Sequence, residues 1–402
     1  MHEARGTEEA KKEPTLYEQI VTMQSTVGKY FPIYGIRFKG EILVFNITCD
    51  DKTLDSNFEK LRIELKEIGY IPMITYSGGE YTIQIIRKPK MKYRSVWVNI
   101  LFLILTIIST VFAGMNIWSD YVSSKELLLL SNFTNGTLFF AMPLMVILGV
   151  HEMGHFIVAR KHNVAASLPF FIPAPFTIFG TFGAFISLRD PIPNRKGMLD
   201  IGIAGPLAGF FVAVPVTFLG LYLTSVTSPP AELTPPTTGL GSSLLFSYIT
   251  DLFPLPEYII LHPLALAGWV GFFVTGLNLL PAGQLDGGHI IKALLGDKSK
   301  YVNYGTILFL MGLGIFSVSW LIFAFIIIIL GLKHPPPLND LIKLAPSRNV
   351  LGAFAIALLV LTFTIFPFVP IKHDFRLSDG TTHHVFSGNN TTFNITIKNT
   401  GE

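Results

Sequence analysis

Two histidines and a glutamate have the spacing used in metal-assisted hydrolysis. They are His151, Glu152 and His155, which form the pattern His-Glu-x-x-His. On an α-helix, residues four apart share a face, so the two imidazoles point at one spot where they can hold a zinc ion. Glu152 is then placed to take a proton from an activated water. The pattern is typical of zinc peptidases.

The motif lies within an apolar stretch long enough to cross a bilayer. Hydrophobic residues make up 50% of the chain and charged residues 14%, whereas a soluble domain carries about 25% charged residues. The alternative interpretation is that both histidines have a structural role only and form polar contacts with neighbouring helices. Ionisable groups at membrane depth are costly and usually functional, which favours catalysis. The motif in this setting indicates hydrolysis inside the membrane.

Composition limits the other possibilities. The net charge of +3 gives no indication of a nucleic-acid partner, and the single cysteine, Cys49, excludes a cysteine zinc cluster and a disulfide framework within the chain. We expect a disordered leader at residues 1–30, without a signal peptide, and a cytoplasmic α+β domain at 31–90 in the order ββαββ. A transmembrane core at 95–369 and an extracytoplasmic, β-rich tail at 370–402 follow.

The core is predicted to be an all-α polytopic bundle of about seven spans. Those spans are Val96–Trp118, Leu138–Arg160, Leu199–Leu223, Leu264–Leu280, Val302–Ile315, Trp320–Leu332 and Leu351–Val369. The region 302–332 is short for two spans, and one span remains the alternative. Basic residues concentrate in the loops placed inside, and the loop 222–262, placed outside, has no Lys or Arg. The positive-inside rule therefore places the N-terminus in the cytoplasm and the C-terminus outside.

A catalytic zinc site needs a third protein ligand. The segment from Asn278 to His289 follows the fourth predicted span, and Pro281 and several glycines break its helix. Asp286 can supply a carboxylate oxygen, and His289 is a rival ligand. The alternative is a loop at the membrane edge in which Asp286 caps a helix.

The motif pair resembles the site-2 protease family of intramembrane zinc metalloproteases. The resemblance covers about residues 139–340 and implies that His151, His155 and Asp286 bind zinc and that Glu152 is the base. The motif positions of Asn278 and Pro281 imply substrate binding. Residues 180–188 resemble the family's re-entrant β-structure, which makes a re-entrant hairpin a candidate element. The pair Gly205 and Gly209 has the GxxxG spacing for close helix packing.

The expected function is cleavage of peptide bonds within or near the transmembrane helices of membrane-anchored, single-span substrates, with Zn²⁺ as cofactor and no nucleic acid. The sequence predicts no oligomeric state. A metal transporter or sensor that uses the same His/Asp cluster is the alternative, although no internal repeat supports it. We expect an integral protein of the lipid bilayer in a prokaryotic cell, with its active site toward the cytoplasm.

Overall fold

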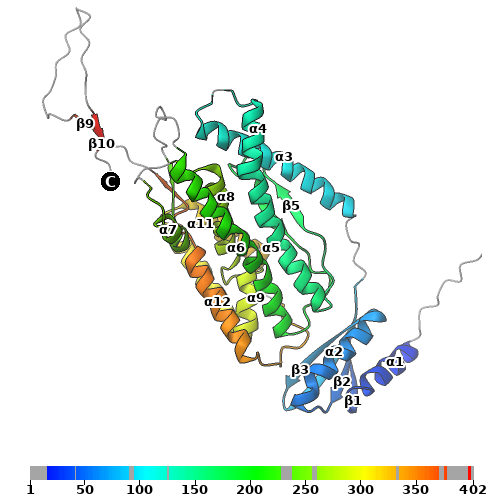
Figure 1. Cartoon of the computed structure of the whole chain (residues 1–402). Coiled ribbons are helices and arrows are strands. Elements are labelled where there is room, and N and C mark those ends of the chain that lie inside the picture. The colour runs from blue at the N-terminus through cyan, green and yellow to red at the C-terminus, as the bar shows by residue number, and fades with distance from the viewer. Residues whose placement is uncertain are drawn as a thin grey trace, which may run out of the picture.

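The computed structural model describes residues 16–40, 42–89, 95–124, 126–227, 238–255, 260–331, 335–370, 375–377 and 397–399. A small sheet domain lies at one end of a mostly helical bundle (Figure 1). The domain consists of α1 (Leu16–Gly28), β1 (Ile33–Lys39), β2 (Ile42–Ile47), α2 (Asp51–Glu67), β3 (Tyr70–Ser77) and β4 (Glu80–Arg87). Its antiparallel sheet has the order β1-β2-β4-β3.

The predicted ββαββ order is confirmed, and its helix is specified locally. Asp50 precedes α2 and its side chain accepts a hydrogen bond from the backbone of Lys52, which satisfies one of the free donors at the helix start. Leu54, Phe58 and Leu61 recur at helical spacing and are buried against the sheet. The N-cap residue Asp50 and the buried apolar face therefore both stabilise α2.

The prediction of a disordered leader over residues 1–30 is wrong for its second half. Residues 16–28 form α1, whose Met23 and Val27 are buried in the core of the sheet domain. The apolar face of α1 gains its partner only when the domain folds, and burial there offsets the entropy of ordering the segment. Residues 1–15 lie outside the described residues.

Three helical stretches are long and apolar enough to cross a membrane within the part of the chain that the structure describes. They are α3 (Val96–Tyr121), the continuous stretch Leu130–Lys161, and α6 (Arg195–Val226). The second stretch comprises α4 (Leu130–Gly136), the π-helical turn η1 (Thr137–Ala141) and α5 (Met142–Lys161). The predicted count of seven spans exceeds these three.

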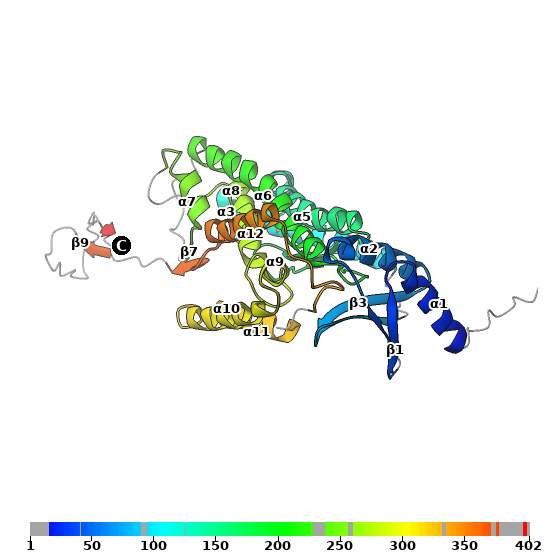
Figure 2. The same cartoon turned by 90° about the horizontal axis from the view of Figure 1, so that it is seen from below.

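The remaining predicted spans are shorter helices. They are α8 (Pro263–Asn278), α10 (Ser299–Leu313), α11 (Val318–Leu330) and α12 (Pro346–Thr362). Region 302–332 contains two helices rather than one, since the backbone turns between Leu313 and Val318. Figure 2 shows α10 and α11 as a pair set apart from the other helices, next to α9 (Asp286–Leu295).

Short elements complete the fold. They are β5 (Phe170–Pro173), β6 (Thr181–Phe185), β7 (Thr238–Leu240), α7 (Leu244–Thr250), η2 (Gly296–Lys298), β8 (Phe368–Pro370), β9 (Phe375–Leu377) and β10 (Ile397–Asn399). The pair β5-β6 forms the predicted hairpin, and β7 pairs with β8 at the opposite end of the bundle from the sheet domain. Of the predicted tail, the structure describes β9 and β10, which pair with each other.

The sheet domain is fastened to the helical bundle through Asp190. The carboxylate of Asp190 pairs with Lys66 at 2.8 Å and with Lys88, and it accepts a hydrogen bond from the backbone of Ala165 at 2.9 Å. Burial alone would raise the pKa of Asp190, but the hydrogen bonds from both lysines and the Ala165 backbone lower it to about 2. This contact holds the domain against the chain between α5 and α6.

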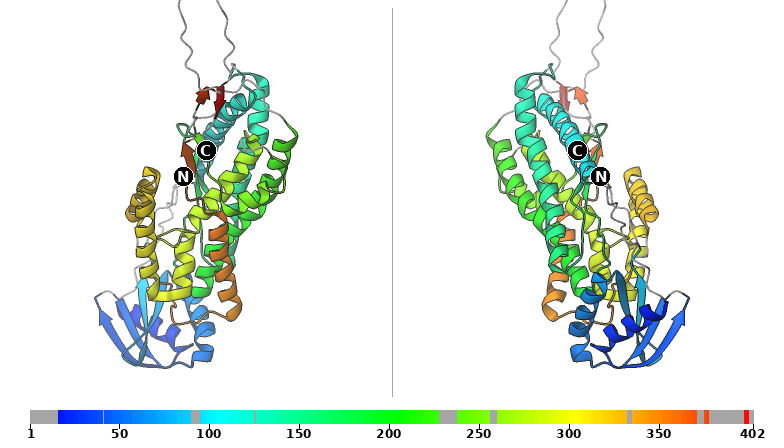
Figure 3. Two further views of the ribbon diagram at one scale, coloured as in Figure 1. Left: turned by 90° about the vertical axis from the view of Figure 1, so that its left-hand side faces the viewer. Right: turned by 90° about the vertical axis from the view of Figure 1, so that its right-hand side faces the viewer.

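A second contact joins the edge of the domain's sheet to the segment before α12. The backbone N–H of Ile74 in β3 donates to the carbonyl of Leu338 at 2.9 Å, and Ile74 bridges Asn339 in parallel. This segment therefore covers part of the β3 edge. Figure 3 shows the sheet domain beneath one end of the helical bundle. The sheet domain therefore contacts both the segment between α5 and α6 and the segment before α12.

Candidate metal centre

The helix α5 carries His151, Glu152 and His155, and all three side chains are buried, with exposed fractions of 3%, 5% and 6%. Burial at this level is unusual for a glutamate unless it has partners. The two histidines lie one turn apart and face α6, as their spacing predicts. The helix therefore presents both imidazoles to the interior of the bundle.

Asp286 completes a group of three side chains whose donor atoms converge. The Nε2 atoms of His151 and His155 lie 3.3 Å apart. The Oδ2 atom of Asp286 lies 3.3 Å from the first and 3.2 Å from the second. A tetrahedral zinc with bonds of about 2.0–2.1 Å keeps its ligand atoms about 3.3 Å apart. All three separations match that value.

Hydrogen bonds fix which atoms of the histidines carry lone pairs. Nδ1 of His155 lies 2.7 Å from the carbonyl oxygen of Ile201, which can only accept, so the proton is on Nδ1 and Nε2 is free. The amide Nδ2 of Asn278 donates to Nε2 of His151 at 3.2 Å, so this nitrogen also carries a lone pair. Three acceptor atoms thus face one another, an arrangement that a divalent cation stabilises.

Glycines on α6 make room for the two imidazoles. A Cβ atom built on Gly205 would lie 2.0 Å from Nε2 of His155, and one on Gly209 would lie 3.1 Å from Cβ of His151. The GxxxG pair therefore packs against the two histidines. The predicted close helix contact is confirmed, and any larger residue at Gly205 would collide with a histidine ring.

Asp286 is the first residue of α9, where a negative charge interacts favourably with the helix dipole. The preceding turn must fold tightly to place it there. A Cβ on Gly287 would lie 2.0 Å from the carbonyl oxygen of Leu279, so only glycine permits this approach. Thr306 of α10 donates to the carbonyl of Pro281 at 3.2 Å and ties the turn to the α10–α11 pair. The position of Asp286 is therefore fixed by the close approach of Gly287 to Leu279 and by the hydrogen bond from Thr306.

A cavity of about 200 Å³ opens beside the three converging side chains. Its lining comes from α5, β6 and the segment after it, α6, the end of α8, the turn before α9 and α9 itself, and includes Glu152 and Ile186. The backbone of Ile186 hydrogen-bonds to the carboxylate of Glu152. At roughly 30 Å³ per water, the cavity has room for several water molecules. Glu152 therefore borders a cavity of water-accommodating size next to the donor cluster.

The structure shows which of the site residues predicted from the sequence lie together and which do not. It brings His151, His155 and Asp286 together, and it places Asn278 against this group. His289 lines the cavity but is not one of the converging donors among the described residues. Pro281 does not line this cavity within the described chain and instead lines a separate apolar cavity beside α9 and α12. Its predicted contact with substrate therefore has no support from the geometry.

Two partners of the site escaped the sequence reasoning. They are the carbonyl of Ile201, which orients His155, and the backbone of Ile186, which holds Glu152. Backbone groups leave no signature in residue type, so neither could be identified in advance. A Cβ on Gly202 of α6 would lie 3.0 Å from the Cβ of His289 and 3.2 Å from the carbonyl oxygen of Asp286, so this glycine lets α6 approach α9 closely.

Comparison with known proteins agrees with this geometry. Residues 139–319 match peptidase family M50, and this range contains every residue of the converging group. A comparison with solved structures gives no match.

Several plant proteins are similar to this chain. "Probable zinc metalloprotease EGY1, chloroplastic" of Arabidopsis thaliana is 32% identical over 252 residues, which are 60% of this chain and 45% of that protein. EGY1 of Oryza sativa subsp. japonica is 33% identical over 59% of this chain and 42% of its own length. "Probable zinc metalloprotease EGY2, chloroplastic" of Arabidopsis is 31% identical over 57% and 42%. The chain thus spans less than half the length of these curated relatives.

The comparisons also correct one expectation. The relatives carry chloroplast names, which goes against the predicted prokaryotic cell membrane, whereas the candidate spans agree with a membrane protein. No comparison supports the transporter or sensor alternative. The motif pair, its convergence in space and the matched residues lead to one conclusion: over residues 139–319 this chain is similar to peptidase family M50, the site-2 protease family.

Proposed function

We propose that the protein is an intramembrane zinc metalloprotease that hydrolyses peptide bonds within or near the transmembrane helices of single-span substrates. The observation that carries the proposal is the convergence of His151, His155 and Asp286 at tetrahedral separations. The names of the plant relatives, which describe zinc metalloproteases, support the choice of metal.

The side chains divide the work of hydrolysis. His151, His155 and Asp286 would hold the zinc, which when bound polarises the scissile carbonyl and makes water nucleophilic near neutral pH. Glu152 lies in the cavity beside them and would accept the proton of the attacking water and deliver it to the leaving amine. The amide of Asn278 reaches the same cavity and can hydrogen-bond the substrate backbone.

A transmembrane helix must unwind before its carbonyls can be attacked, because they are engaged in its own hydrogen bonds. The hairpin β5-β6 offers a partner for the unwound strand. Among the described residues β6 pairs only with β5, so its other edge is open, and Ala184 and Phe185 of β6 line the cavity. Pairing along this edge would align a substrate strand with the site. Pro281 would shape the turn before Asp286 without touching substrate.

We further propose that all seven apolar helices enter the bilayer, with the sheet domain and the active site on the cytoplasmic side. The lack of Lys and Arg between residues 222 and 262 supports this orientation. Replacing Cys49 and placing single cysteines at Asn163 or Ser225 tests it in sealed inside-out vesicles. An impermeant maleimide should label the cysteine at 163 and spare that at 225. The reverse pattern would contradict the orientation.

The activity is tested with purified full-length protein and a labelled single-span substrate in detergent. Glu152→Gln should keep one zinc per chain and lose cleavage, because only the proton acceptor is removed. Asp286→Asn should lose both zinc and cleavage, and His289→Ala, the matched control in the same cavity, should keep its zinc. Normal cleavage by Glu152→Gln would refute the assignment of the base.

A further inference from the structure

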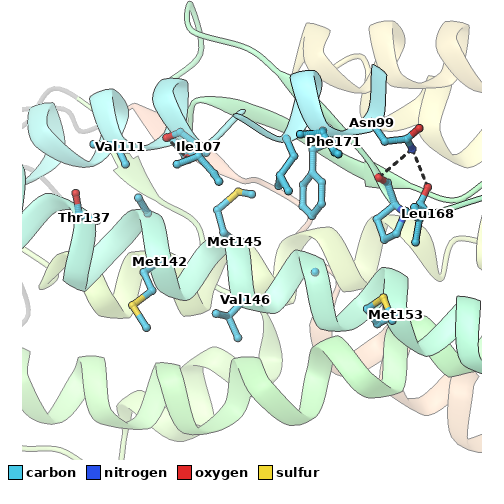
Figure 4. Close-up of a pocket in the computed structure, with 16 residues that line it drawn as sticks. Asn99, Ile107, Val111, Thr137, Met142, Met145, Val146, Met153, Leu168 and Phe171 are labelled. Carbon is cyan, nitrogen blue, oxygen red and sulfur yellow. Dashed lines mark hydrogen bonds between the residues drawn. The ribbon is translucent and has the colours of Figure 1, made fainter. Parts of the chain in front are cut away.

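A second, larger cavity lies on the other side of α5. It measures about 570 Å³, within the range of roughly 300–1,000 Å³ that is typical of ligand sites. Its walls are α3, η1, α5 and the start of β5. In Figure 4, Met145 and Phe171 lie in the gap between α3 and α5, and Met142, Val146 and Met153 follow one another along α5. The lining is almost wholly apolar, with Asn99 at one end.

A separate, cationic cavity of about 390 Å³ lies farther along α5, toward its C-terminal end. Met153 lines the first, and Phe156 and Arg160 line the second, so the stripe on α5 runs on for two more turns. The chain after α5 borders both, with Ala165 in the cationic cavity and Leu168 in the apolar one. The two cavities follow one another along α5, one apolar and one cationic, and are together called the α5 groove.

The positive end of the α5 groove has an available cation. The guanidinium of Arg160 lies 5.5 Å from the centre of the Phe156 ring, and the side chain is exposed. No carboxylate partner of Arg160 is recorded in the described part of the chain. Lys66 also lines this end, although it is already paired with Asp190. The cationic cavity therefore presents the positive charge of Arg160 next to the apolar cavity on the same helix.

The α5 groove lies behind the catalytic helix rather than beside the site. At about 100° per residue, the stripe of Met142, Gly149 and Met153 is rotated roughly 150° from the stripe of His151 and His155. A substrate helix lying in this groove would be separated from the donor cluster by the whole of α5. The groove is thus poorly placed to deliver a scissile bond, and its occupant must be another molecule of the membrane.

We infer that the α5 groove binds an anionic phospholipid, with an acyl chain in the apolar body and the phosphate near Arg160. The apolar walls suit a hydrocarbon chain, and the exposed guanidinium suits a phosphate, which it can bind through two hydrogen bonds. The occupied groove would fill the gap between α3 and α5 and so brace the back of the helix that carries the histidines.

The inference is tested by native mass spectrometry of the full-length protein in neutral detergent, titrated with phosphatidylglycerol or with phosphatidylcholine. The first phosphatidylglycerol should bind about fivefold more tightly than phosphatidylcholine. Arg160→Gln should abolish this preference. The matched control Lys298→Gln, an exposed lysine outside the groove, should retain it.

The apolar body is tested with two neighbouring isoleucines of α3. Ile107 lines the groove and Ile108 does not, and both are exposed, at 44% and 60%. Ile107→Trp should weaken the binding of both lipids at least fivefold by filling the groove, and Ile108→Trp should change neither. Thermal melting followed by circular dichroism checks that each variant is folded.

Three results of the lipid-binding measurements would overturn the inference. They are equal affinity for the two lipids in the unaltered protein, a preference that survives Arg160→Gln, and identical effects of the two tryptophan variants. A photoreactive group at position 107 that captures a single-span substrate instead of lipid would also overturn it. Because the readout is lipid binding, loss of the inference would leave the proposed protease activity untouched.

Discussion

A single methyl group on α6 should disable the metal site. In Gly205→Ala, the new Cβ would stand 2.0 Å from Nε2 of His155, where ordinary contacts begin at 3.4 Å. The clash is therefore 3.4 − 2.0, about 1.4 Å, and either the imidazole or the helix must move by that amount. The ring cannot retreat freely, because its Nδ1 is held by the carbonyl of Ile201 and its Nε2 by the donor cluster.

The size of the displacement decides the outcome. Metal–ligand distances in a working site stay within about 0.2 Å of their ideal values. A shift of about 1.4 Å is several times larger and would remove His155 from the first coordination shell. Loss of an outer partner already costs about 10–100-fold in metal affinity, so we expect at least 100-fold weaker zinc binding for Gly205→Ala. Cleavage should fall with it.

The assay compares zinc affinity and cleavage with a matched glycine. Gly312 of α10 also lies in a helix, and a Cβ there would meet nothing within 4 Å. Both changes gain about 0.5–1 kcal/mol of helix propensity, so a loss of zinc cannot arise from the helix backbone itself. Gly312→Ala should keep full zinc binding. Wild-type zinc affinity in Gly205→Ala would refute the packing argument for the site.

Three further expectations concern the elements around the site. Asp190→Asn should weaken docking of the sheet domain by about 2 kcal/mol at pH 6, because a carboxyl whose pKa is lowered from 3.8 to about 2 stabilises the fold above its unfolded pKa. The difference in docking free energy between Asp190→Asn and the unaltered protein should vanish as the pH falls from about 4 to about 2. Pulsed hydrogen exchange of segment 162–166 measures it, and a difference that stays constant over this pH range would contradict the expectation. Thr306→Val should cost about 1 kcal/mol and speed exchange in the turn 279–285, whereas Thr134→Val, which loses an exposed bond within its own helix, should not. Phe58→Ala should destabilise the sheet domain by about 3–5 kcal/mol and expose it to proteolysis, and unchanged proteolysis would be inconsistent with its buried position.

Much of the site was predictable because its chemistry resides in side chains with fixed spacing. His151 and His155 had to share a helix face once the segment was helical, and a helix-breaking segment carrying Asp286 was the place to seek a third ligand. The convergence itself required the fold, since nothing in the local sequence states that α9 begins against α5. For the same reason, the residues alone could not decide whether Asp286 or His289 is the third ligand.

Other features depend on partners that a sequence does not display. The segment 16–28 was assigned to a disordered leader because the surface that buries Met23 and Val27 exists only in the folded domain. Substrate binding by Pro281 stays a prediction, since a motif position says nothing about which side of a turn faces the cavity. Four of the seven predicted spans correspond to short helices, and the length of these helices alone does not establish that they cross the membrane.

The central claim is that three side chains from α5 and α9 bind one zinc ion. X-ray absorption of the full-length protein loaded with a single equivalent of zinc tests it most directly, with Asp286→Asn measured alongside. We predict two imidazole nitrogens and a carboxylate oxygen at about 2.0–2.1 Å, and loss of tight zinc binding in Asp286→Asn. An identical spectrum and affinity in Asp286→Asn would contradict the account.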